Sequence, residues 1–364
     1  MGHMIDQHVD QHFFRLLVDK FLRGIDEKLF VTKSVREIIF DGYHDPLLDN
    51  FEKVLNLLPF LKKMVPEGSV MDKFAFFYGR NGTDYTDGVF NMYTGKGDAT
   101  KMGQVHSWNY STVGYFPDEC GNIKGGAGEF YPPGLEKTYI EMFSNDLCRT
   151  LRLNFNAEVY VKGIDSFEYV ADKSFFANGT ENPLNKCYEP ENIFLPSGVY
   201  NTSICRFGAP VFVSQPHFLL ADPYYLDMIG SGLSPNSSLH RTYFRVEPRA
   251  GVPTDVTARF QLNVLVDKVN GISMMENVRK AFFPIMWFEN KAGVPETLVF
   301  KMKLLANLPE ILKSIGWAQI GVSVAICIIS TLMMVSKKRE EDMSPILDQS
   351  VEDDSQDENV FLDQ

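Results

Sequence analysis

The sequence predicts an α+β fold with an antiparallel sheet, followed by one membrane-spanning helix. Apolar residues follow helical spacing only near the start of the 364-residue chain. The middle consists of short segments rich in Phe, Tyr and Val, broken by Gly and Asn, which is typical of strands and turns. A long uncharged apolar segment lies near the C-terminus. Helices segregated from a run of strands favour an α+β domain.

We expect residues 1–64 to form a helical segment. Apolar residues within 11–40 recur at the spacing of one helix face, and Thr32 or Ser34 suits the cap of a second helix. A further short helix is predicted within residues 46–63.

Residues 65–314 are predicted to form a β-rich domain. The clearest strand pattern lies at residues 259–266, where apolar and polar residues alternate. Such alternation predicts a half-buried antiparallel strand. The apolar set is Phe260, Leu262, Val264 and Val266, and the polar set is Arg259, Gln261 and Asn263.

Common enzyme motifs are absent from the sequence: it has no G-x-S-x-G, H-E-x-x-H, P-loop or G-x-G-x-x-G pattern. His8 and His12 are four residues apart and could face one metal ion, but Val9 stands where a metalloprotease has its glutamate base. A solvated helix face is the favoured interpretation. We therefore expect no catalytic residue, no cofactor and no metal.

The net charge of −12 comes mostly from one end, because residues 340–364 contain ten acidic and no basic residues. The rest of the chain is therefore near −2 (−12 + 10). Without a basic stripe, nucleic-acid binding is not expected.

Four of the five cysteines precede the apolar segment, and they could form two disulfides or remain four buried thiols. Asn-x-Ser/Thr sequons predict N-glycosylation in a lumenal or extracellular domain. Both signals indicate the secretory pathway, where disulfides persist. The cysteines are Cys120, Cys148, Cys187 and Cys205, and the sequons begin at Asn81, Asn109, Asn178, Asn201 and Asn236.

Residues 315–335 contain no charge and are predicted to form a transmembrane helix. Twenty-one residues rise about 32 Å as a helix, enough for a hydrocarbon core of about 30 Å. Lys337, Lys338 and Arg339 follow as a cytoplasmic flank would, but three upstream lysines match them in number. The disulfides and glycans therefore decide the orientation, with residues 336–364 as an acidic cytosolic tail.

The tail contains a candidate sorting signal. Asp342, Ile346 and Leu347 have the spacing of an acidic dileucine-type motif, in which an extended peptide fills adaptor pockets with two apolar side chains. Its expected partners are cytosolic sorting adaptors.

The first residues, MGHMIDQHVDQHFF, show no apolar leader or anchor. Either the domain is cytosolic and tail-anchored, or the N-terminal part is missing, and we favour a missing N-terminus.

Several segments together resemble the class B scavenger receptor family, which includes fatty-acid translocase, a lysosomal integral membrane protein and insect sensory neuron membrane proteins. The resemblance runs from His12 to Val335. The segments that carry it are LFVTKSVREIIFDGYHDPLL from Leu29, DLCR from Asp146, FANGTENPLNKC from Phe176, CRFGAPVFVSQPHFLLADP from Cys205, HRTYFRVEP from His240, and PIMWFEN before the apolar segment.

The resemblance implies an irregular antiparallel β-barrel ectodomain with apical helices and an apolar tunnel that carries lipids. It also implies two membrane helices, of which only the second is present in this sequence. Closure of the barrel and an intact tunnel are therefore in doubt for this chain alone. The family pattern pairs Cys120 with Cys187, and Cys148 with Cys205.

The resemblance places the family's ligand-binding helix at residues 12–28. Its cations could attract anionic ligands, although a solvated charged face is the simpler interpretation for each. His12 could in addition release a partner at endosomal pH. The candidate ligand-binding residues are His12, Arg15, Lys20, Arg23 and Lys28.

The expected function is a membrane glycoprotein that binds and transfers lipids such as fatty acids, sterols, carotenoids or lipoprotein lipid. Its expected location is the plasma membrane, endosomes or lysosomes. The alternatives are a sorting receptor for a lumenal protein and a tail-anchored cytosolic protein.

Overall fold

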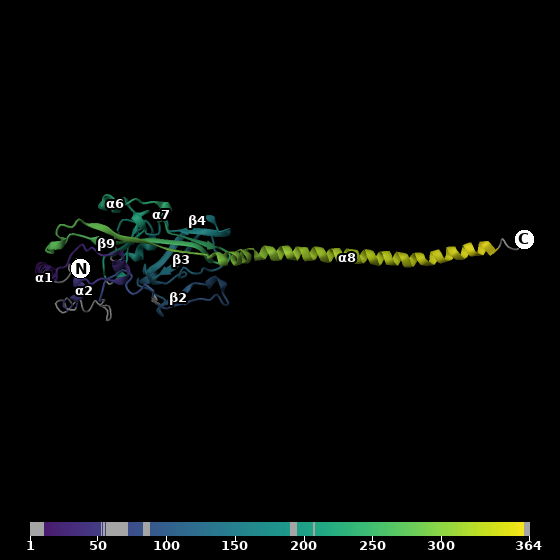
Figure 1. Cartoon of the computed structure of the whole chain (residues 1–364), viewed down its shortest axis with the longest axis horizontal. Coiled ribbons are helices and arrows are strands. Elements are labelled where there is room, and N and C mark those ends of the chain that lie inside the picture. The colour runs from purple at the N-terminus through teal and green to yellow at the C-terminus, as the bar shows by residue number, and fades with distance from the viewer. Residues whose placement is uncertain are drawn as a thin grey trace. The chain divides into compact units, whose positions relative to one another are not determined.

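The structure is a computed structural model that describes residues 11–51, 53, 55, 72–82, 88–189, 195–206 and 208–359, without the side chains of 11–14, 306 and 342–359. The chain divides into two units, Met1–Val299 and Phe300–Gln364. Figure 1 labels the main elements of each unit. The first unit is the β-rich domain, and the second contains most of the C-terminal helix.

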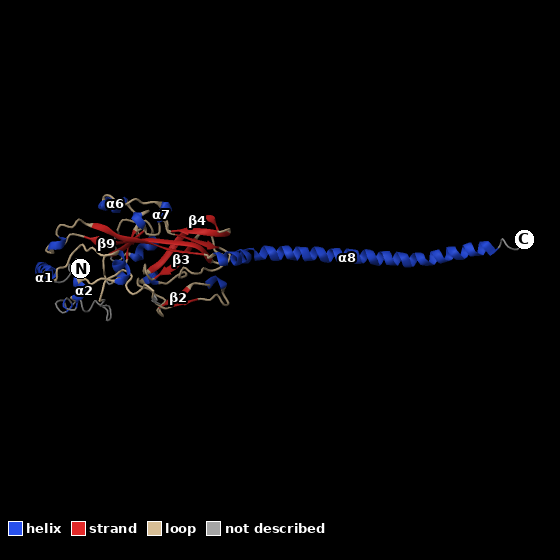
Figure 2. Cartoon of the chain, viewed as in Figure 1, coloured by secondary structure: helices blue, strands red, loops and turns tan. Residues whose placement is uncertain are grey.

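The β-rich domain is built on one eight-stranded antiparallel sheet (Figure 2). The strand order is β3-β4-β5-β8-β9-β7-β6, with β10 also paired to β9. The strands are β3 (Tyr139–Ser144), β4 (Arg149–Val161), β5 (Ile164–Val170), β6 (Val199–Asn201), β7 (Val211–Ser214), β8 (Tyr243–Glu247), β9 (Val252–Val266) and β10 (Ala281–Gly293). A separate pair contains β1 (Phe90–Met92) and β2 (Val105–Trp108).

The sheet branches at β9. One edge of β9 pairs with β8 near Thr257 and with β7 near Val264, while the other edge pairs with β10 along almost its whole length. The strands that the structure describes therefore form an open, branched sheet. The closed barrel that the resemblance implies is not seen among them.

The antiparallel pairing predicted for residues 259–266 is confirmed, but the prediction of a half-buried strand is wrong. Gln261 and Asn263 on the polar face are 1% and 0% exposed. Asn263 donates to Ser214 Oγ at 3.0 Å, and Gln261 accepts from the His217 backbone N–H at 2.8 Å. Because these amides are hydrogen-bonded, a polar face can be covered without the cost of an unpaired buried group.

The main core lies around β4, β5 and β8 and is rich in aromatic rings. Two disulfides, Cys120–Cys187 and Cys148–Cys205, join segments 67 and 57 residues apart within it. The members of this main core are Phe116, Cys120, Tyr131, Ile140, Leu147, Cys148, Leu151, Leu153, Tyr169, Ala171, Phe175, Phe176, Tyr188, Tyr200, Val213, Phe244, Val246 and Phe260.

Short helices surround the sheet. They are α1 (Gln11–Gly24), the π-turn η2 (Glu37–Asp41), α2 (Pro46–Asp49), η3 (Ala99–Lys101), α5 (Asp118–Gly121), η4 (Pro183–Tyr188), η6 (Ser203–Cys205), η7 (Pro216–Phe218), α6 (Pro223–Ile229), α7 (Ser237–His240) and η8 (Ser273–Met275).

The predicted cap at Ser34 is confirmed. Glu37 N–H donates to Ser34 Oγ at 3.3 Å, and Ser34 N–H donates back to the Glu37 carboxylate at 2.8 Å, as in a capping box. Residues 1–10 and 56–71, which include His8 and most of the helix predicted within 46–63, lie outside the described residues.

The C-terminal helix α8 (Glu296–Asn359) contains the predicted membrane segment. Residues Asn307–Glu341 form a segment long and apolar enough to cross a membrane, and an 18-residue window within it has a mean hydropathy of 2.1. The helix continues through residues 336–359, which include the backbone of the sorting signal that we expected to be an extended peptide.

Candidate functional site

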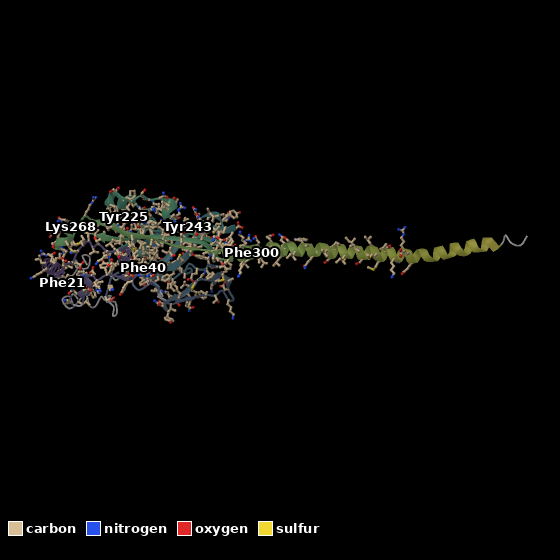
Figure 3. All side chains as sticks on the ribbon, in the orientation of Figure 1. Phe21, Phe40, Tyr225, Tyr243, Lys268 and Phe300 are labelled. Atoms are coloured by element: carbon tan, nitrogen blue, oxygen red, sulfur yellow. A yellow bond between two sulfur atoms is a disulfide. The ribbon has the colours of Figure 1, made fainter. Side chains whose placement is uncertain are left out.

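Helix α1 is attached to the connection between β9 and β10. Val18 and Leu22 of α1 form a small core with Ile272, and Phe21 and Leu47 pack against it. Figure 3 labels Phe21 and, in the β9–β10 connection, Lys268. We call the cluster of Val18, Leu22 and Ile272 the α1 core.

Asp19 is the polar anchor of this attachment. It is 4% exposed, and one carboxylate oxygen accepts from Ser273 N–H at 2.7 Å and from Ser273 Oγ–H at 2.6 Å. Arg23 forms an ion pair with the other oxygen. These hydrogen bonds from Ser273, followed by the Arg23 charge, hold the pKa of Asp19 below its ordinary value although burial acts in the opposite direction.

The predicted ligand-binding cations lie in or just after α1, but each has a local environment of its own. Arg15 is half-buried and approaches the Asn270 carbonyl at 3.5 Å. Arg23 is paired with Asp19, and Lys28 lies 3.3 Å from Asp26. Lys20 is exposed. The side chain of His12 lies outside the described residues, so its proposed role stays a prediction.

A row of large apolar side chains is exposed on β10. Phe283, Ile285 and Trp287 alternate along the strand and are 45%, 39% and 44% exposed. Trp287 lies edge-on to the His240 ring, with the centroids 5.8 Å apart. In the sequence, this segment contributed only to the resemblance to a receptor family. The alternation of apolar residues could have identified an apolar face of the strand, but not that this face is exposed. We call these three residues the β10 row.

A chain of ring contacts connects the surface with the main core. Phe40 lies 6.3 Å from Phe77, and Phe77 lies 5.9 Å from Phe288 of β10. Phe288 in turn lies 6.2 Å from the buried Phe260 ring. Aromatic contacts of this kind are favourable at such distances and edge-on or tilted angles.

His217 and His240 form a stacked pair with ring centroids 4.4 Å apart. Nδ1 of each ring accepts a backbone N–H, from Ser234 at 3.0 Å and from Asn236 at 3.1 Å. Burial, then the neighbouring His217 and Arg259, hold the pKa of His240 below its ordinary value.

A cavity of about 200 Å³ lies beside the Cys120–Cys187 disulfide, between β4 and η4. Charged and polar side chains share its lining with apolar ones such as Phe175 and Leu184. The charged lining residues are Glu119, Lys124, Glu141, Arg149 and Arg152. Arg152 is paired with Glu141 at 2.8 Å.

The predicted glycosylation sites differ in exposure. Asn81, Asn109 and Asn236 are exposed, whereas Asn178 and Asn201 are half-buried. The Asn178 side-chain amide donates to the Leu195 carbonyl at 2.9 Å. The use of these sequons stays a prediction.

The side chains of Asp342, Ile346 and Leu347 lie outside the description, although their backbone belongs to α8. The sorting signal therefore also stays a prediction.

A disulfide-bonded antiparallel domain followed by one exposed apolar helix defines a membrane protein whose folded domain suits an oxidising compartment. Residues 3–334 match the CD36 family, and the chain belongs to that family of class B scavenger receptors.

Three relatives illustrate the match. Protein peste of Drosophila melanogaster is 36% identical over 301 residues, which are 80% of this chain and 52% of that protein. Scavenger receptor class B member 1 of Sus scrofa is 30% identical over 333 residues, which are 90% of this chain and 62% of the relative. Lysosome membrane protein 2 of Homo sapiens is 29% identical over 315 residues, which are 84% of this chain and 62% of that protein. The chain thus spans between half and two thirds of the length of these relatives.

Proposed function

We propose that this protein is a receptor that binds lipids or lipoproteins on the non-cytosolic side of a membrane and is not an enzyme. Membership of the CD36 family supports the receptor class. The β10 row carries the lipid part of the proposal, because it exposes three large apolar side chains next to one another on one face of a strand. An exposed apolar surface on a folded domain commonly marks a site that binds a protein, a membrane or an apolar ligand.

Affinity for an acyl chain would come from removing apolar surface from water. Each buried methylene contributes about 0.8 kcal/mol, so several methylenes against the β10 row suffice for binding without a specific polar contact. The ring contacts from Phe40 to Phe260 include Phe288 of β10 and hold this strand against the main core.

We further propose that lipid transfer uses a closed barrel with an apolar tunnel. Among the described strands, β10 pairs only with β9, so its outer edge is open to another strand. In a receptor of the length of the relatives, further strands could pair at this edge and continue the sheet beyond β10.

Binding of a labelled long-chain fatty acid to the delipidated, detergent-solubilised chain tests the proposal. We expect saturable binding that Ile285→Asn weakens about fivefold to tenfold, since about 1 kcal/mol or more of apolar contact is lost. Tyr160→Asn changes an exposed aromatic residue on β4 and should bind as the parent does. Absence of saturable binding in the parent chain would refute lipid binding by this surface.

A second candidate function is sorting of a lumenal protein to endosomes or lysosomes. The tail motif at Asp342, Ile346 and Leu347 and the similarity to a lysosome membrane protein favour it. Replacing Ile346 and Leu347 by Ala should move the protein toward the plasma membrane. Val351→Ala, also in the tail, is the matched control, and an unchanged location of the double variant would exclude the signal.

The lumenal placement itself is tested by removing N-glycans enzymatically. We expect a loss of apparent mass for protein made in a eukaryotic cell, because five sequons precede the membrane segment. No change in mass would instead favour a tail-anchored cytosolic protein.

A further inference from the structure

Arg149, the first residue of β4, is a buried cation with only neutral partners. Arg149 is 6% exposed. Nη2 donates to Asn185 Oδ1 at 2.8 Å, and Nε donates to the Thr150 carbonyl at 3.3 Å. The guanidinium lies 3.7 Å from the ring centroid of Tyr188 and 5.0 Å from that of Tyr200. Within the described part of the chain, no carboxylate forms an ion pair with it.

Arg259 provides an internal comparison. It is almost equally buried, at 7% exposed, but its Nε lies 2.7 Å from the Glu289 carboxylate. The half-buried Arg245 contacts both Glu168 and Asp255. Buried charges are usually paired, because an uncompensated one loses its hydration without replacement. Arg149 lacks the countercharge that these arginines have.

The guanidinium of Arg149 is held in a fixed orientation. The amide nitrogen of Asn185 donates to the carbonyls of Ser174 at 3.1 Å and Ala177 at 2.7 Å, so the amide oxygen is left to face Arg149. The Tyr188 ring fixes the plane of the guanidinium from one side. A cation oriented in this way needs little rearrangement to bind a ligand.

The cavity beside the Cys120–Cys187 disulfide gives a ligand access to this cation, since Arg149 is one of its lining residues. The charges of Arg152 and Glu141 compensate each other in their ion pair. Lys124 and Glu119 are both exposed, where water and salt weaken their effects, and they have opposite signs. The charge left in the least hydrated part of the cavity is therefore that of Arg149.

We propose that this cavity binds an oxyanion, a phosphate or carboxylate group, in direct contact with the Arg149 guanidinium. The planar donor array of arginine matches the oxygens of both groups. A volume of about 200 Å³ accommodates a small anion or a head group but not a long acyl chain. Burial lowers the pKa of Arg149. The site rests on this geometry alone and does not depend on the proposed function.

Thermal unfolding of the detergent-solubilised full chain tests the site, with inorganic phosphate added at constant ionic strength against chloride. We expect saturable stabilisation in the parent protein, because a ligand of the folded state raises its stability. Arg149→Met should weaken the apparent affinity about tenfold or more, since a charge-assisted contact is lost.

If Arg149→Met does not fold, two single variants at exposed residues still test the site. Leu184→Glu places a negative charge in the cavity lining at a residue that is 62% exposed, and it should weaken phosphate binding several-fold. Leu239→Glu makes the same change on α7 at a residue that is 60% exposed and outside the lining, and it should bind phosphate as the parent does.

Competition identifies the source of the oxyanion. Displacement of phosphate by short-chain phosphatidic acid or by hexanoate shows that the site accepts a lipid head group, whereas phosphate binding without displacement shows a site for a free anion. Either result supports the site. No stabilisation beyond chloride, or equal stabilisation of the Leu184→Glu and Leu239→Glu variants, would overturn it.

Discussion

The main core and the α1 core differ in how they are held together. Among the described residues, the main core contains 18 buried residues, including one cysteine of each disulfide, whereas the α1 core contains three. The α1 core relies in addition on the hydrogen bonds from Ser273 to Asp19. Because apolar burial scales with area, we expect the main core to open only with global unfolding and the α1 core to open locally.

This difference also separates the two candidate binding regions. The Arg149 cavity lies beside the Cys120–Cys187 disulfide, so its geometry should persist whether or not a ligand is bound. The cations of α1 depend on a helix with few buried contacts, so a partner that binds them could also shift the docking of α1.

The largest expected effect comes from replacing a leucine by alanine in each of the two cores and comparing the resulting losses of stability. Leu153→Ala should destabilise the β-rich domain by about 2–5 kcal/mol, since the deleted side chain leaves a cavity in the main core. Leu22→Ala should speed amide hydrogen exchange in α1 and leave protection of β4 unchanged. Loss of β4 protection in Leu22→Ala would show that the cores open as one unit.

The next effect concerns Asp19. Asp19→Ala leaves the Ser273 N–H and hydroxyl without their acceptor and should weaken α1 docking by about 1–3 kcal/mol. Hydrogen exchange of α1 measures this, with the exposed Asp227→Ala of α6 as the control.

Acid should have a related effect on the parent protein. Because the pKa of Asp19 is lowered in the folded state, its stabilisation is complete above the ordinary aspartate pKa of about 3.9 and is lost as the pH falls through the folded value. The α1 core should therefore remain closed at pH 5. Opening of α1 between pH 7 and 5 would contradict the assigned role of Asp19.

A smaller effect is expected at the stacked histidines. The pKa of His240 is lowered in the folded state, so its contribution to stability is complete above about pH 6.5 and is lost as the pH falls through the folded value. Denaturant unfolding at pH 7 and 5 should show a smaller acid-induced loss for His240→Gln than for the parent. Val113→Gln, at an exposed residue without a titrating group, is the control and should keep the parent's pH dependence.

The smallest effect is expected at Lys28. Its ion pair with Asp26 is exposed, with 64% and 87% of the two side chains accessible. Lys28→Ala should change the free energy of unfolding by about 0.5 kcal/mol or less, because solvent screens such pairs. A larger loss would show that Lys28 supports the α1 core.

Part of the fold could be predicted because its signals are local. The apolar segment at residues 315–335, the capping residue Ser34 and the antiparallel strand at 259–266 each follow from a short stretch of sequence. The disulfide pairs came only with the resemblance to a family. Spacing alone had left paired and free thiols open.

Other features could not be predicted because their partners are distant in sequence. Ser273 and Asp19 are 254 residues apart in the sequence, so the sequence of α1 gives no sign that Ser273 holds the Asp19 carboxylate. The polar face of β9 looked solvated, but Ser214 and the His217 backbone satisfy it.

By itself, the sequence determined that a β-rich domain precedes an apolar helix, because periodicity and composition are properties of neighbouring residues. Only the tertiary structure decided that Arg149 is buried without a carboxylate while Arg259 has one, and that the β10 row stays exposed. Burial and charge compensation depend on which strands pack together, and these strands come from segments far apart in the chain.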